Sequence, residues 1–128
     1  MKRVCLLISV LLMSAVSAVA SSRVLIGSEW VPENTTKTFL QFNANGMVSG
    51  VGGCNRFSGT YEISGETLMF GPLASTRMAC AENVMRAEQA FLEALSVTAS
   101  YSLEAGDAEL VLKSETGVEL MRLLRTDP

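Results

Sequence analysis

Histidine is absent from the 128-residue chain, and cysteine and basic residues are scarce. Without His, the chain cannot form a Ser-His-Asp triad, a Cys-His dyad, a His-containing metal site or a His proton relay. Three Cys are too few for a four-Cys zinc site or for a disulfide-dense miniprotein. Ten Lys and Arg stand against 13 Asp and Glu, so no basic excess is available to bind nucleic-acid phosphates. The common catalytic and metal-binding solutions are therefore excluded.

The first twenty residues differ in composition from the rest of the chain. Two basic residues at positions 2 and 3 precede an almost wholly apolar run, and the sequence Ala-Val-Ala at positions 18–20 fits an A-x-A cleavage site. We predict that residues 1–20 are a signal peptide cleaved after Ala20, and that residues 21–128 form one exported domain. The alternative is an uncleaved inner-membrane anchor, although the apolar segment is marginal for spanning about 30 Å of hydrocarbon.

Cleavage changes the properties of the chain that remains. It leaves 108 residues, and the net charge becomes −5 instead of −3 because two basic residues are lost. Position 21 is Ser rather than Cys, so we predict neither a lipid anchor nor any other stable membrane anchor. The predicted location is the periplasm, with secretion from the cell as an alternative.

Export leaves two thiols, Cys54 and Cys80, because Cys5 lies in the predicted signal peptide. An even pair of cysteines in an oxidising compartment predicts a disulfide. Closing a loop of this size stabilises a small domain by about 3–4 kcal/mol in the chain-entropy model. A catalytic thiol is disfavoured because there is no His base, and the spacing is far wider than Cys-x-x-Cys.

Short alternating segments separated by turn residues indicate a mainly β (α+β) domain. An amphipathic helix is predicted over residues 83–95, with Asn83 as N-cap and a Glu82–Arg86 pair. At Asn45-Gly46, two residues that tolerate positive φ predict a hairpin. We expect an antiparallel meander curled into a small barrel-like sheet with one packed helix, since curling buries the inner face and removes open edges. The predicted strands are 38–42, 47–51, 60–63, 68–70, 99–104, 110–112 and 118–124, with 73–76 a candidate for one more.

Two motifs in the sequence resemble those of a known family. They are Gly53-Cys54-Asn55-Arg56-Phe57-Ser58-Gly59 and, further along, Thr76-Arg77-Met78-Ala79-Cys80. Together they resemble the META domain, or HslJ-like, family, with a likeness that extends over about residues 27–124. The resemblance implies a small, mostly β domain with a barrel-like sheet and one helix. It also implies an envelope protein linked to stress tolerance, including heat shock and antibiotic resistance, and it supplies no catalytic residues.

Five motif residues are candidates for binding. Asn55 either ties down a turn or contacts a ligand. Arg56 and Arg77 each lie near a Cys in sequence, so they form an anion or carboxylate site or else bond to backbone carbonyls and nearby carboxylates. Thr76 supports either role, and Phe57 is expected to plug the core or the end of the barrel rather than to serve as a ligand platform.

These observations lead to three ranked hypotheses of function. The first is a non-enzymatic envelope stress-resistance protein that binds a protein or small ligand at the barrel mouth or around the bridge. The alternative is an inhibitor of an envelope or host hydrolase, because small disulfide-stapled domains are rigid. An enzyme is third. We expect a monomer with no cofactor, no metal and no nucleic-acid partner; the partner is an envelope protein or a small ligand.

Overall fold

The computed structural model describes residues 23–127. The predicted signal peptide and its cleavage site lie outside the described residues. Within residues 23–127, no helix combines the length and the apolar character that a membrane crossing requires.

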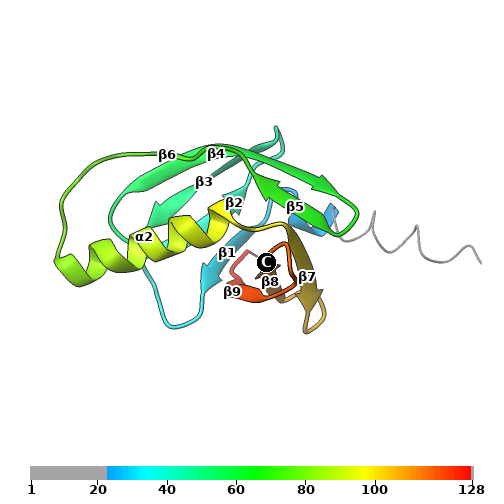
Figure 1. Cartoon of the computed structure of the whole chain (residues 1–128). Helices are drawn as coiled ribbons and strands as arrows, with labels where there is room; N and C mark the ends of the chain where they lie inside the picture. Colours follow the sequence, from blue (N-terminus) through cyan, green and yellow to red (C-terminus); the bar gives the residue numbers. More distant parts are fainter. Residues whose placement is uncertain (1–22, 128) are drawn as a thin grey trace, which may run out of the picture.

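Residues 23–127 contain nine antiparallel strands and the 15-residue helix α2, Glu82–Ser96 (Figure 1). Strands that follow one another in sequence pair with each other, as in a meander, except at β6, which pairs with β4 while β5 pairs directly with β7. The strands are β1 Glu29–Pro32, β2 Thr38–Phe42, β3 Met47–Gly52, β4 Arg56–Ser64, β5 Thr67–Phe70, β6 Ala74–Ser75, β7 Ser100–Glu104, β8 Glu109–Lys113 and β9 Glu119–Arg125.

The sheet closes into a ring in the order β3-β2-β1-β9-β8-β7-β5-β4, and β3 pairs with β4. The contact between β5 and β7 is the short one, with a single register pair at Thr67 and Ser100. Strands β5 and β6 share one edge of β4, where β5 pairs with residues 61–64 and β6 with residues 57–58. The ring is therefore closed beside β5, whereas β6 pairs only with β4 among the described strands.

The inner face of the ring and one face of α2 bury a continuous apolar core. In β2, the alternation directs Thr38, Leu40 and Phe42 inward, as its period-2 pattern requires. Burying each large apolar side chain contributes about 1.5–3 kcal/mol. The core residues are Leu25, Trp30, Leu40, Phe42, Val48, Phe57, Tyr61, Leu68, Phe91, Leu95, Tyr101, Leu110, Leu112 and Leu123.

The predicted fold class is confirmed: the protein is mostly β, with a ring-like antiparallel sheet and one main helix. Strand β1 was not predicted, because four residues ending in Pro carry too little alternation to indicate a strand. Strand β4 begins at Arg56 rather than at residue 60, because its first residues pair with β3 and β6.

One local prediction was wrong, and two others were confirmed. Asn83 is not the N-cap of α2, because the helix begins one residue earlier and Ala81 takes that position without a side-chain bond. The predicted hairpin at Asn45-Gly46 joins β2 to β3, and of its two turn residues Gly46 has the positive φ, of 81°. Asn45 instead accepts a hydrogen bond at its side-chain oxygen from the backbone N–H of Met47, at 3.1 Å. The Glu82–Arg86 ion pair does form, at 3.7 Å on the exposed surface.

Candidate functional site

An exposed segment, which we call the strap, consists of residues 74–81 and lies between β5 and α2, directly before the helix. All eight residues are exposed, although they include the short strand β6. In Figure 1 the strap begins with β6, runs past the end of the sheet and turns back into α2. Thr76 holds it to β4, since its N–H donates to the carbonyl of Arg56 at 3.0 Å and its hydroxyl accepts from the N–H of Arg56 at 3.1 Å.

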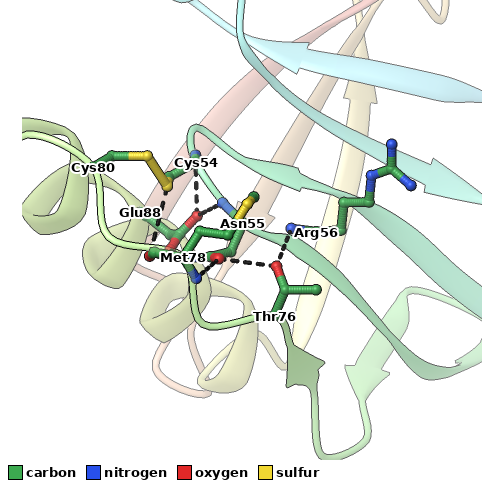
Figure 2. Close-up of a disulfide and its surroundings, with 7 residues drawn as sticks. All are labelled: Cys54, Asn55, Arg56, Thr76, Met78, Cys80 and Glu88. Carbon is green, nitrogen blue, oxygen red and sulfur yellow. Dashed lines mark hydrogen bonds between the residues drawn. A yellow bond between two sulfur atoms is a disulfide. The ribbon is translucent and has the colours of Figure 1, made fainter.

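The predicted disulfide between Cys54 and Cys80 is confirmed, and it joins the end of the strap to the corner between β3 and β4 (Figure 2). Two glycines let this corner lie against α2. A Cβ on Gly52 would fall 2.7 Å from Cγ of Glu88. Gly53 has a φ of 118°, which residues other than glycine rarely adopt. The Gly-Gly-Cys sequence therefore brings the bridge and the helix together.

Asn55 connects the corner, the strap and the helix through its side-chain hydrogen bonds. Its side chain is 3% exposed, yet each polar atom is fully used. The oxygen Oδ1 accepts from the Thr76 hydroxyl at 2.9 Å and from the N–H of Met78 at 2.6 Å. The nitrogen Nδ2 donates to the carbonyl of Met78 at 3.2 Å and to Oε2 of Glu88 at 2.7 Å. This geometry favours the tie-down role, because no polar atom of Asn55 is left for a ligand.

Glu88 is a buried carboxylate on α2, only 5% exposed, that faces Asn55. Its Oε1 accepts the backbone N–H groups of Cys54 and Asn55, at 3.2 and 2.5 Å. Burial alone would raise the pKa of Glu88. The hydrogen bonds from the Asn55 side chain and from these two backbone groups outweigh burial, so the pKa lies below its usual value. Glu88 is therefore a buried anion held by three donors.

The sequence contained a signal for Glu88 that the pattern analysis missed. Residues 84, 88, 91 and 95 repeat at helical spacing, so position 88 lies on the apolar face of α2. A charged residue in such a position needs buried hydrogen-bond donors. The motif Cys54-Asn55 supplies them, although its distance of more than thirty positions in sequence hides the pairing.

The other candidate residues differ in burial and in their contacts. Phe57 is 3% exposed and packs edge to face on Phe91, with ring centroids 5.7 Å apart, so it belongs to the core. Arg56 and Arg77 are both exposed, and in the described part of the chain neither makes an ion pair. Figure 2 shows the side chain of Arg56 directed away from the bridge. Thr76, which precedes Arg77, forms hydrogen bonds to the backbone of Arg56.

A groove of about 760 Å³ runs between α2 and the segment that precedes the strap. Its lining combines apolar side chains with a charged rim, and within residues 23–127 no cluster of His, Cys, Asp or Glu is suited to hold a metal ion. We call the strap and this groove together the bridge region. The groove is lined by Gly71, Pro72, Leu73, Glu82, Met85, Arg86, Glu88, Gln89, Leu92, Glu93 and Ser96.

These features define a small β-barrel-like domain whose exposed strap is tied to the barrel by a disulfide and a buried polar cluster. The model of the META domain matches residues 20–127, and the chain belongs to the META domain family. The resemblance noted from the two sequence motifs is thereby confirmed. Membership of this family suggests a stress-related or envelope protein.

Solved structures share the fold. A protein from Burkholderia xenovorans, determined by NMR, superposes with a TM-score of 0.65 and 26% identity, covering 85% of this chain and 88% of its own. A second NMR structure has a TM-score of 0.57 and 25% identity, covering 77% and 88%. A DUF4847 family protein from Bacteroides vulgatus has a TM-score of 0.54, 18% identity and coverage of 72% and 61%, which shows the fold alone. The search of curated proteins found no match.

Proposed function

We propose that this chain is an exported, non-enzymatic envelope protein that supports stress resistance by binding a protein or small molecule at the bridge region. The family supports the stress or envelope context. The disulfide supports export, because such bonds form and persist in oxidising compartments. The predicted signal peptide supports the same location.

One observation carries the binding proposal: every residue of the strap is exposed, and yet the strap is firmly held. An exposed segment adds little to the core, so burial does not account for the disulfide and the buried Asn55–Glu88 pair that fix it. Fixing a surface before binding lowers the entropy that binding costs. The groove beside the strap adds a hollow with the apolar side chains of Leu73, Met85 and Leu92.

The chemistry of the bridge region supports a role without catalysis. A general base works best with a pKa near the operating pH and with a lone pair free to take a proton. The pKa of Glu88 is instead lowered, and its oxygens already accept three hydrogen bonds. Glu88 therefore suits structural anchoring better than proton transfer.

The proposal is tested by gene deletion followed by challenge with heat, novobiocin and detergent. We expect lower survival of the deletion strain in at least one challenge and full rescue by the wild-type gene. Met85→Glu places a charge in the groove and should not rescue survival. The matched control Met69→Glu makes the same change at a methionine that is 59% exposed outside the groove, and it should rescue fully.

Thermal unfolding of both purified variants establishes that they fold as the wild type does. Unchanged survival of the deletion strain in all three challenges would contradict the stress role. Equal rescue by both methionine variants would contradict binding in the groove.

A further inference from the structure

The backbone of the strap alternates between inward and outward residues. The N–H of Thr76 bonds to β4, and both the N–H and the carbonyl of Met78 bond to the side chain of Asn55. In an extended chain, successive residues direct their backbone groups to opposite sides. The N–H and carbonyl groups of Ser75 and Arg77 therefore face away from the body of the protein.

This alternation matches what a serine protease requires of the segment it binds. Such enzymes hold an extended chain as an added strand, through backbone groups of the residue before the scissile bond and of the residue two places earlier. Arg77 and Ser75 have this spacing and outward direction. From this geometry we infer that the strap is an inhibitory loop for a serine protease that cleaves after basic residues, with Arg77 entering the specificity pocket. This inference rests on the proposed binding role of the bridge region and names its partner.

The side chain of Arg77 suits an acidic specificity pocket. It is exposed, and no described residue forms an ion pair with it. Transfer into the pocket therefore breaks no ion pair in the described protein, while the guanidinium gains a charge-assisted contact with the pocket carboxylate. Proteases of this class select such a side chain at the residue before the cleaved bond.

The anchors on either side of Arg77 distinguish an inhibitor from a substrate. Asn55 bonds to Thr76 before Arg77 and to Met78 after it, so one buried side chain holds both flanks of the Arg77–Met78 peptide bond. The disulfide fixes Cys80 shortly afterwards. A segment held in its bound conformation loses little entropy on association, and its two flanks remain in place in the protease cleft.

The test uses bovine trypsin as the probe, with residual activity measured on a chromogenic arginine substrate. We expect the wild type to inhibit trypsin with one-to-one stoichiometry. Arg77→Ala should weaken inhibition by about 100-fold or more, as for a hot-spot anchor. Arg77→Lys should inhibit trypsin, whereas Arg77→Phe should inhibit chymotrypsin instead. The matched control Arg56→Ala removes the other exposed motif arginine and should inhibit like the wild type.

A second variant separates inhibition from simple cleavage. Cys54→Ser with Cys80→Ser frees one anchor, so trypsin should cut the strap between Arg77 and Met78 faster than in the wild type. Mass spectrometry identifies the cut, and circular dichroism before protease addition establishes that the variant is folded.

Three results would overturn the inference. They are full trypsin activity at about 50 µM wild-type protein, well above the dissociation constants of specific complexes, equal inhibition by wild type and Arg77→Ala, and wild-type cleavage after Arg77 without inhibition. The proposed function fails on different evidence. If Met85→Glu abolishes stress survival while trypsin is not inhibited, groove binding stands and the inhibitory loop does not.

Discussion

The bridge region and the β7-β8-β9 sheet are held together in different ways. The pairs β7–β8 and β8–β9 each align five residue positions, with one register shift between Leu112 and Lys113 in the second pair. In contrast, β6 aligns only two positions with β4, and the rest of the strap depends on a disulfide and on the Asn55–Glu88 pair. Backbone pairing is sufficient where strands are long. Where the chain leaves the sheet, covalent and buried polar contacts fix it instead, and this is where we place the binding surface.

The two regions also differ in how their charged side chains are held. Glu88 is a buried anion with no cationic partner among residues 23–127, and backbone and amide donors hold it. On the β7-β8-β9 surface, Arg122 donates to three partly exposed carboxylates at 2.6–2.9 Å. These hydrogen bonds raise the pKa of Arg122, and the bond to Glu104 has the largest effect. Exposed ion pairs contribute little to stability because water and salt screen them, so the comparison predicts larger mutational effects in the bridge region. The three carboxylates belong to Glu104, Glu109 and Glu119.

The largest expected loss follows removal of the bridge. Cys54→Ser with Cys80→Ser should lower the free energy of unfolding by about 3.5 kcal/mol, because the unfolded chain regains the entropy of a loop with a separation of 26 residues. Urea denaturation measures the change. Reduced wild-type protein is the control and should show a similar loss. Stability equal to that of the oxidised wild type would mean that the bridge does not hold the region together.

The next effect concerns the buried anion. Glu88→Gln should cost about 2 kcal/mol at neutral pH, because an amide cannot accept all three donors. The matched control Glu93→Gln makes the same change at an exposed position of α2 and should cost less than about 0.5 kcal/mol. Equal unfolding free energies for the two variants would contradict the structural role of Glu88.

The effect of Glu88 should depend on pH in a defined direction. Its pKa is lowered in the folded protein, so the stabilisation is complete above the unfolded-state pKa of about 4.3 and is lost as the pH falls through the folded-state pKa. The gap in unfolding free energy between wild type and Glu88→Gln should therefore narrow below about pH 4. A gap that widens on acidification would show that the carboxylate is not stabilised as an anion.

The smallest effect is expected at the surface network. Arg122→Ala should lower Tm by less than Glu88→Gln does, and the loss should shrink in about 1 M NaCl because salt screens exposed charges. Thermal unfolding at low and high salt measures both values. A salt-independent loss as large as that of Glu88→Gln would erase the contrast between the two regions.

The sequence was sufficient for features that depend on local pattern or simple counts. Strand β2 has the predicted bounds, because Thr38–Phe42 alternates cleanly between buried and less buried positions. The disulfide followed from two cysteines in a chain with a predicted export signal. The ring followed from many short strands and a single helix.

The sequence was insufficient where distant segments determine the structure. Periodicity placed position 88 on a helix face, but it did not reveal that Asn55 and the corner after Gly53 supply the donors for that carboxylate. The shared anion site of Arg56 and Arg77 stays a prediction. The structure directs Arg56 away from the bridge, and the two motifs meet through hydrogen bonds among Asn55, Thr76 and Met78, which the sequence did not reveal.

Amide hydrogen exchange across the strap tests most directly that this exposed segment is held in a fixed, alternating conformation. The account predicts that the amides of Thr76 and Met78 exchange at least about 100-fold more slowly than unprotected amides, because both donate inward. The amides of Ser75 and Arg77 face outward and should exchange at nearly unprotected rates. Fast exchange at all four positions would contradict the account, since the strap would then be free to move.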